Sequence, residues 1–448
     1  MKVQHNFFLK NKEIKNIIEY ILSFVKTRLA TAEVLVSHNV GVNFGIRNKN
    51  IDHVEFNNNN FLKITIYKNN RTSTVSSTNF NISEVNKIIN FSIDSIDYTS
   101  VDVYSGLPDL ELLAIGNLED LNLYHYWKWD INHITNLMLE GEQEAFKIDK
   151  RIINTEGSNF SSCMSMIVFG NSHGMLESYN TTLYSMSNCM ISKENDDMQR
   201  DMSYTISRDI NELVSFKKIG VQASKKSLSR LCSKKLSSRS SPIIFSSELA
   251  SDFFSYLSQA INGYHVYNQS TFLSNSLEQK IFPHWLSIEE RSDIKKGLGS
   301  KCFDSEGVRT FSKMIVQDGF LKTWLLNSYS ARKMNLVSTA NSGGIHNWLV
   351  LGISNMNLNE LLMLMYKGIL ITELLGNGLN LITGDYSCGA AGFWIERGCI
   401  QYPVSEITIS GNLKDMFKNI ISIGCDIDKR HKILSGSILL PSIQISGL

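Results

Sequence analysis

The chain has 448 residues, of which 43% are hydrophobic and 19% charged, so it can bury a core and is not disordered by composition. Its 44 basic and 43 acidic residues give a net charge of +1, whereas nucleic-acid-binding proteins usually carry a clear basic excess. Seven cysteines without a C-x-x-C pair favour reduced thiols over a disulfide framework or zinc ribbon. No signal-peptide pattern or run of about 18 apolar residues occurs, so we expect a cytoplasmic protein without membrane contact.

The predicted elements begin with an amphipathic helix, because apolar residues recur every three or four positions from Ile14 to Val25. Short β-branched or aromatic segments then predict strands at 42–47, 51–56, 61–68 and 71–77. Asn-rich turns, including Asn57–Asn60, are expected between these strands, since Asn tolerates left-handed turn positions. A helix over 84–96 and a loop over 103–109 complete this part.

The rest of the chain continues with helices and antiparallel strands. Helical patterns occur at 130–151, 247–261, 358–366 and 413–422. Strand patterns occur at 160–204, at 242–245 and in the closing residues 438–445, and glycines punctuate short strands from Gly297 onward. The segment 217–239 carries eight basic residues and is expected to be a solvated helix face or an inter-domain linker, rather than a phosphate-binding surface.

These patterns lack βαβ alternation and predict an α+β fold of mainly antiparallel sheets with packed helices. Three regions are expected: an N-terminal sheet-and-helix region over 1–124, a central region with the basic helix over 125–238, and a β-rich C-terminal domain over 239–448.

The residues alone give weak signals for catalysis. None of the ten histidines lies three to five residues from another, so a zincin helix with its paired imidazoles is missing. The sequence GNSHG at 170–174 fits the nucleophile-elbow pattern, but a strand follows it, so a hairpin turn is the better interpretation. Asp304 and Glu306, and likewise Asp385, lie beside glycines, where carboxylates are also ordinary turn residues.

A set of longer strings carries more information. GDYSCGAAGFWIE at 384–396 is followed by QYPV at 401–404 and EITISGNLKDM at 406–416. Further motifs occur in order: YSGLPD at 104–109, NSHG at 171–174, MQRD at 198–201, FDSEG at 303–307, YSARK at 329–333, STAN at 338–341 and GGIHN at 343–347. Over nearly its whole length the chain resembles the PmbA (TldE) subunits of the TldD/PmbA metalloprotease family.

This resemblance implies a subunit of a heteromeric zinc-dependent peptidase that cleaves unfolded or small peptides. The zinc is expected on a TldD-like sister subunit that carries H-E-x-x-x-H, and none on this chain. The matching helix here reads FSYLSQ at 254–259, and neither Phe254 nor Gln259 can replace an imidazole. One departure is Cys388, which stands where the family usually has Arg.

The resemblance also gives candidates for the substrate channel, namely Asp385, Tyr386, Ser387, His346 and Asn347. The glycines of a loop over 384–392 are expected to let the backbone approach a peptide, with Asp385 and Tyr386 facing the partner's metal. Two alternatives remain: the chain is itself a catalytic metallopeptidase with ligands from distant residues, or it is a non-enzymatic regulatory peptide binder.

Overall fold

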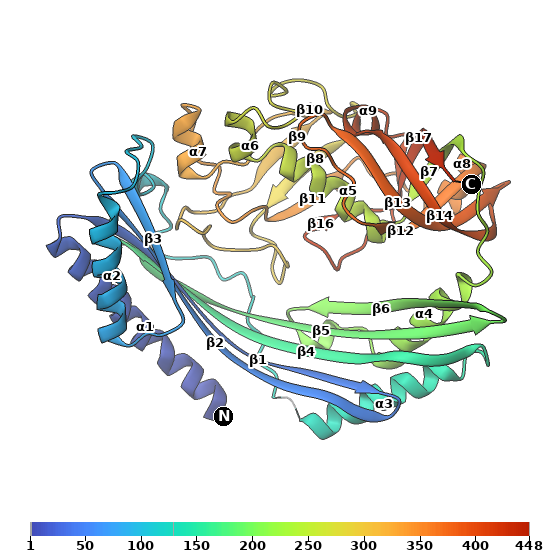
Figure 1. Ribbon diagram of the computed structural model, residues 1–448, viewed down its shortest axis with the longest axis horizontal. Coiled ribbons are helices and arrows are strands. Elements are labelled where there is room, and N and C mark those ends of the chain that lie inside the picture. The colour runs from blue at the N-terminus through green and yellow to red at the C-terminus, as the bar shows by residue number, and fades with distance from the viewer. Residues whose placement is uncertain (1, 129, 448) are drawn as a thin grey trace.

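A computed structural model describes residues 2–128 and 130–447, and Figure 1 shows a long curved sheet that faces a β-rich C-terminal half. The expected α+β fold is confirmed: an antiparallel half-barrel sheet with helices precedes a region that contains a small barrel. Within the described part of the chain, no helix is both long and apolar enough to cross a membrane.

The elements follow one another with short connections in most of the chain. The helices are α1 (Lys2–Thr27), α2 (Ile82–Ile96), α3 (Ile131–Phe146), α4 (Phe216–Ser229), α5 (Ser247–Ala260), α6 (Gly263–Tyr267), α7 (Ser328–Lys333), α8 (Leu358–Met365) and α9 (Leu413–Lys418). The first six strands are β1 (Thr31–Arg47), β2 (Asn50–Lys68), β3 (Arg71–Ser77), β4 (Ile152–Asn171), β5 (Leu176–Glu194) and β6 (Asp197–Ser207). The remaining strands are β7 (Arg239–Phe245), β8 (Ser287–Arg291), β9 (Lys313–Gln317), β10 (Phe320–Leu321), β11 (Asn347–Leu351), β12 (Lys367–Leu375), β13 (Asp385–Glu396), β14 (Cys399–Asn412), β15 (Ser422–Ile423), β16 (Ile433–Leu434) and β17 (Ile438–Ser446).

The N-terminal sheet has the strand order β3-β2-β1-β4-β5-β6, so strands from the first two expected regions share one sheet. Its apolar residues alternate along each strand and gather on one face. At one end, α1 and α2 pack on Val34 and Val36. At the other end, α3 and α4 pack on Val42 and Phe44, which belong to the same face of β1. The opposite face of the sheet is left without helices.

The predicted turn at Asn57–Asn60 is wrong, because these residues lie inside β2. Each Asn pairs with a residue of β1, from Asn57 opposite Gly41 to Asn60 opposite His38. The Nδ1 atom of His38 lies 2.7 Å from Oδ1 of Asn60. Pairing with a long neighbouring strand therefore overrides the local turn preference of Asn.

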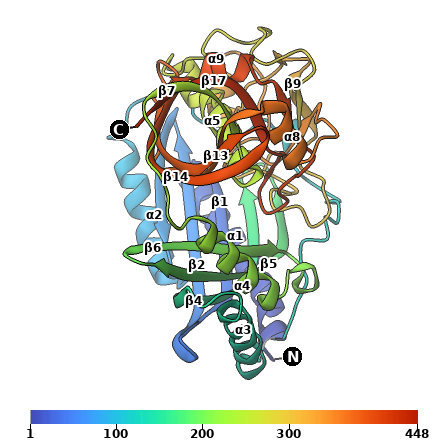
Figure 2. The ribbon, with the colours of Figure 1, turned by 90° about the vertical axis from the view of Figure 1, so that its right-hand side faces the viewer.

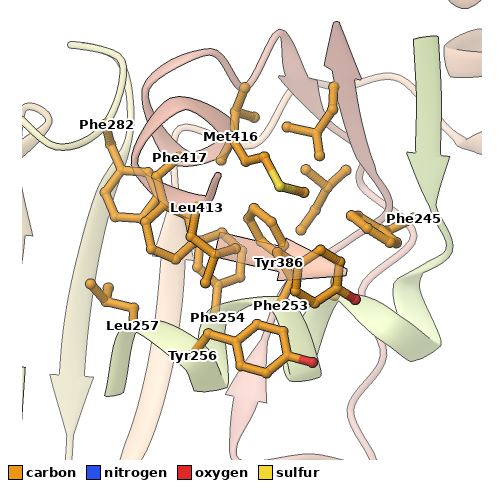
Figure 3. Packing of buried hydrophobic residues seen from close by; sticks show 14 of the residues in the cluster. Phe245, Phe253, Phe254, Tyr256, Leu257, Phe282, Tyr386, Leu413, Met416 and Phe417 are labelled. Carbon is orange, nitrogen blue, oxygen red and sulfur yellow. The ribbon is translucent and has the colours of Figure 1, made fainter. Parts of the chain in front are cut away.

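The C-terminal half contains a closed barrel of β14, β13, β12, β7 and β17, which the pairing between β14 and β17 completes. Figure 2 shows this barrel as a ring. A second sheet has the order β10-β9-β8-β11-β16. The core beside the barrel includes Phe253, Phe254 and Leu257 of α5, packed with Phe417 of α9 and Phe282 (Figure 3).

Arg332 of α7 ties the C-terminal half to the loop that precedes α3. Its guanidinium donates to the carbonyl oxygens of Tyr104 at 3.2 Å and Gly106 at 3.0 Å, and also to that of Leu107. Two of the sequence motifs thus meet in space, although more than 220 residues separate them in the chain.

Candidate functional site

The face of the long sheet that lies opposite its helices is largely polar and mostly half-buried. It consists mainly of small side chains on alternate positions of β1, β4 and β5: Ser37, Asn39, Asn43, Asn159, Ser161, Ser165, Thr181, Ser185 and Ser187. We call these residues the polar face. In Figure 1 the concave side of the sheet is turned toward the C-terminal half, and the same face also carries the larger side chains of Ile167, Tyr179 and Leu183.

Asp385 and Ser387 are exposed residues of β13. The carboxylate of Asp385 accepts a hydrogen bond from Thr383 Oγ1 at 2.7 Å and another from Asn412 Nδ2 at 3.1 Å. These bonds, from Thr383 first and then from Asn412, hold the pKa of Asp385 below its ordinary value. Asp385 is therefore a fixed, exposed anion.

Tyr386 lies between these two residues and points the other way, into the core. Its ring centroid lies 5.5 Å from that of Tyr256, and Figure 3 shows both rings beside α5. The sequence-based expectation of an exposed Tyr386 is not met, because neighbouring residues of a strand project from opposite faces. Only Asp385 and Ser387 remain as surface candidates in this segment.

The expected Gly-rich loop over 384–392 is also corrected, since all of it except Gly384 belongs to β13. A Cβ atom on Gly392 would lie 1.9 Å from the carbonyl oxygen of Leu370, and one on Gly389 would lie 3.2 Å from Cβ of Leu375. The two glycines therefore allow β12 and β13 to approach within the barrel. Their small size serves strand packing in this chain.

His346 is buried in a polar network around Glu290. A carboxylate oxygen of Glu290 accepts the backbone N–H of His346 at 3.0 Å and the indole N–H of Trp348 at 3.0 Å, and Lys313 Nζ lies 2.5 Å from the other oxygen. Burial lowers the pKa of His346, so a neutral ring is favoured, and its Nε2 lies 2.9 Å from the carbonyl oxygen of Ala340. The position of His346 indicates a structural role within this chain.

Asn347 is buried next to His346 and holds the loop over 297–300. Its side chain accepts the N–H of Gly299 at 2.8 Å and donates to Ser300 Oγ and to the carbonyl oxygen of Arg291, both at 2.8 Å. His346 and Asn347 start the β11 region, whereas Asp385 and Ser387 lie in the barrel sheet. The five candidates thus divide into one exposed pair and three buried residues.

Helix α5 contains FSYLSQ at 254–259, the segment that the sequence resemblance aligned with a metal-binding helix. Phe254 is fully buried in the aromatic core, whereas Gln259 is exposed on another side of α5. Over the described ranges, no three His, Cys, Asp or Glu side chains are grouped so that they could hold a metal ion. This segment of α5 cannot coordinate zinc, because the buried residue Phe254 has no ligating atom.

Cys388, which the resemblance places where the family usually has Arg, is buried at the barrel wall. Its Sγ donates to the carbonyl oxygens of Leu375 at 3.4 Å and Gly376 at 3.3 Å. The structure thus gives Cys388 a role in packing and hydrogen bonding.

The sequence analysis missed the buried carboxyl group of Glu33, which lies near Glu306 and titrates like Asp304. The carboxyl groups of Glu33 and Asp304 are buried where the sheet meets the C-terminal half, and burial followed by the neighbouring Glu306 raises both pKa values to about 7. Asp304 also accepts the backbone N–H groups of Glu306 and Val308, which confirms the turn interpretation of this motif.

The other predicted turns and charges are as expected. GNSHG joins β4 to β5 and forms a hairpin, with the N–H of Gly174 donating to the carbonyl oxygen of Asn171 at 3.0 Å.

In the basic segment, Lys217 pairs with Glu140 and Lys226 with Glu248, and further ion pairs involve Arg230 and Lys235. The acids of this chain therefore neutralise much of the segment.

Comparison with known proteins agrees with this fold. Residues 32–96, 124–231 and 238–447 match domain 1, the central domain and the C-terminal domain of PmbA/TldA metallopeptidases. The chain is 55% identical to a metalloprotease PmbA homolog of Buchnera aphidicola subsp. Baizongia pistaciae, over 98% of each chain. It is 45% identical to metalloprotease PmbA of Escherichia coli O157:H7, over 100% of this chain and 99% of that protein.

A solved structure shows the same architecture. It comes from Bacteroides thetaiotaomicron, has modulation of DNA gyrase as its suggested role, and matches with a TM-score of 0.91 at 26% identity, over 97% of this chain and 99% of that one. The fold thus defines a metallopeptidase of the three-domain PmbA/TldA type. The chain belongs to the PmbA/TldD metalloprotease family and is similar to its PmbA members.

Proposed function

We propose that this chain is the PmbA-type subunit of a heteromeric zinc-dependent peptidase and shapes the substrate chamber without binding the metal. Its partner in this proposal is a TldD-like sister subunit, and its substrates are unfolded or small peptides. The observation that carries the proposal is the aromatic core position of Phe254, on the helix that would have to supply metal ligands.

The polar face supports a chamber for extended peptides. Its serine and asparagine side chains offer both donors and acceptors, which suits a main chain of any sequence. The edge strand β6 lies on the side of the sheet nearest the C-terminal half (Figure 1). Edge strands can bind extended peptides through main-chain hydrogen bonds, as in other cases of strand addition.

The exposed pair Asp385 and Ser387 is our candidate for contact with the peptide near the partner's metal. The Thr383 and Asn412 hydrogen bonds orient the Asp385 carboxylate, so it can accept an N–H group from a substrate without reorganisation. His346 and Asn347 contribute indirectly in this proposal, by fixing the loops of the second C-terminal sheet.

The experiment compares cleavage of an unfolded protein substrate by this chain, by the sister and by their mixture. We expect cleavage only by the mixture, and at least about 10-fold slower cleavage for the complex with Asp385→Ala and Ser387→Ala, because a hydrogen bond to a charged group contributes about 1.5 kcal/mol or more. The control is Asp415→Ala, which removes an exposed carboxylate on α9. Metal-dependent cleavage by this chain alone would favour the catalytic alternative, and peptide binding without cleavage by any combination would favour the regulatory one.

A further inference from the structure

A cavity of about 280 Å³ lies between α6, α7 and the loop over 341–344. Figure 1 shows these two short helices next to each other in the C-terminal half. Three strings singled out in the sequence meet in the lining: Tyr329 and Ser330 come from YSARK, Asn341 from STAN, and Gly343 and Gly344 from GGIHN. None of these five residues belongs to the candidate site described above.

Three tyrosines form one wall of the cavity. Tyr264 and Tyr267 belong to α6 and Tyr329 to α7. The ring centroids of Tyr264 and Tyr267 lie 5.7 Å apart with an angle of 78° between the planes, and those of Tyr267 and Tyr329 lie 6.0 Å apart at 67°. Tyr264 is 60% exposed, so most of its ring is open to solvent. We call the cavity that these three rings line the tyrosine pocket.

The inner end of this wall is fixed before any ligand binds. The hydroxyl of Tyr329 donates to Oδ2 of Asp102 at 2.6 Å. The Nζ atom of Lys333 lies 5.5 Å from the ring centroid of Tyr329 and 4.4 Å from that of Tyr104. Since these contacts hold the ring of Tyr329, a ligand would not have to order that side of the pocket.

The opposite wall is main chain without side chains. Gly343 and Gly344 are exposed and have φ values of 87° and 102°, which favour glycine. A Cβ atom on Gly343 would lie 2.3 Å from Oγ of Ser305, whereas one on Gly344 would meet no atom within 4 Å. Within residues 2–128 and 130–447, neither the N–H nor the carbonyl oxygen of Gly343 makes a hydrogen bond. Gly343 therefore offers a main-chain donor and a main-chain acceptor, the two groups that bind another polypeptide.

The size and chemistry of the pocket select the side chain that fits it. Its volume lies just below the range of about 300–1,000 Å³ that is typical for drug-sized ligands, so it suits one side chain. No charged residue of the described chain is part of its lining, and a charged side chain would therefore lose hydration there without gaining a partner. Aromatic rings gain edge-to-face or offset contacts with tyrosines in addition to burial.

We propose that the tyrosine pocket binds an aromatic side chain of a substrate peptide, whose main chain forms hydrogen bonds with Gly343. This inference rests on the proposed function, since it names a preference among the same substrates. It adds a recognition site away from Asp385 and Ser387, which lie in the barrel sheet.

The test measures binding of peptides to the purified full chain by calorimetry, so it does not depend on cleavage. The peptides are unlabelled, because a fluorescent label carries aromatic rings of its own. They are acetyl-Gly-Ser-Phe-Ser-Gly-amide and the same sequence with Leu or Ala in place of Phe. The wild-type chain should bind the Phe peptide about 10-fold more tightly than the Ala peptide, with the Leu peptide in between.

A fourth peptide tests the contact with Gly343. It has an ester oxygen in place of the amide N–H of Phe, so it lacks the donor for the carbonyl oxygen of Gly343. We expect about 5-fold weaker binding than for the Phe peptide, the effect of one lost hydrogen bond. Equal affinity would contradict the main-chain contact.

Variants of α6 show whether the rings are responsible. Tyr264→Ala combined with Tyr267→Ala should reduce the preference for Phe over Ala to about 2-fold or less. Because Tyr267 is half-buried, Tyr264 is also changed alone. Tyr264→Ala should reduce the preference about 3-fold, whereas Tyr264→Phe retains the ring and should keep it. The matched control is Tyr98→Ala, which removes a tyrosine that is 92% exposed and does not line the pocket.

Three outcomes would overturn the inference: equal or undetectable binding of the Phe and Ala peptides by wild type, a full preference in the Tyr264→Ala variant, or an equal loss in Tyr98→Ala. Cleavage separates this inference from the proposed function. If the mixture with the sister cleaves peptides while this chain shows no preference for Phe, the inference alone is contradicted. A preference for Phe in binding without cleavage by the mixture contradicts the proposed function alone.

Discussion

Glu33 and Asn171 are direct cross-strand neighbours between β1 and β4, and each buries a polar atom that has no hydrogen-bond partner. These atoms are Oε2 of Glu33 and Nδ2 of Asn171, and the statement holds for the residues that the structure describes. Burial and then the charge of Glu306 raise the pKa of Glu33 to about 7. The sheet therefore contains a carboxyl group that is partly protonated at neutral pH.

The first prediction concerns Glu33→Gln and pH. Because the folded pKa lies above the ordinary value of 4.5, the proton stabilises the fold fully below about pH 4.5, and this contribution is lost as pH rises through about 7. Glutamine does not titrate, so from pH 4.5 to 8 the difference in unfolding free energy should shift in favour of the variant by up to about 3 kcal/mol. Chemical denaturation across this pH range measures the shift.

The control for this measurement is Glu55→Gln, which removes an exposed carboxylate from the same sheet. Asp304 titrates in wild type and in both variants, so its contribution to the unfolding free energy cancels when the variants are compared with wild type. A pH-independent difference between Glu33→Gln and wild type would contradict the raised pKa, even if the variant were more stable throughout.

The sequence predicted elements well where apolar periodicity was strong. The helix expected at 84–96 is α2, Ile82–Ile96, and the helix expected at 247–261 is α5, Ser247–Ala260. The alternation in 438–445 likewise identified β17. In each case one face of the element packs against the core, so periodicity and burial report the same feature.

The errors arose where long-range pairing overrides local preference. Asn57–Asn60 lie in a strand because β1 pairs with all four residues, and Gly389 and Gly392 lie in a strand because β12 comes close to them. The motif at 384–396 alone does not show which side chains of β13 face solvent. A shift of the strand by one residue would exchange its buried and exposed faces.

The second prediction concerns the core of α5. Leu257 is fully buried among aromatic residues, so Leu257→Ala should lower the unfolding free energy by about 2–5 kcal/mol through lost packing and a cavity. Gln259→Ala on the same helix replaces an exposed side chain and should change stability by less than about 0.5 kcal/mol. Urea denaturation of both variants makes the comparison, and similar midpoints would show that this helix does not pack as described.

The third prediction concerns metal content. The purified chain should carry well below one zinc per chain, because Phe254 and Gln259 cannot supply the ligands of a zinc helix. Elemental analysis after dialysis against zinc measures this directly. The complex with the sister is the positive control, and one tightly held zinc on this chain alone would contradict the assignment of the metal to the partner.

The last prediction concerns the buried pair of Glu290 and Lys313. Burial alone would raise the pKa of Glu290, but Lys313 and then His346 hold it below the ordinary value. The ionised Glu290 carboxylate therefore stabilises the fold fully above the ordinary pKa of 4.5, and this stabilisation is lost as the pH falls through the lowered pKa. Glu290→Gln leaves Lys313 without its counter-ion and should cost about 3–5 kcal/mol of unfolding free energy at pH 7.

Two further variants separate the charge effect from packing. Glu289→Gln changes a more exposed carboxylate that lies 3.9 Å from Arg291, and it should cost less than about 1 kcal/mol. Glu290→Gln combined with Lys313→Met should be more stable than Glu290→Gln alone, since the unpaired ammonium is then removed. If the double variant instead lost the sum of both single effects, the network around His346 would depend on the hydrogen bonds of Glu290 more than on its charge.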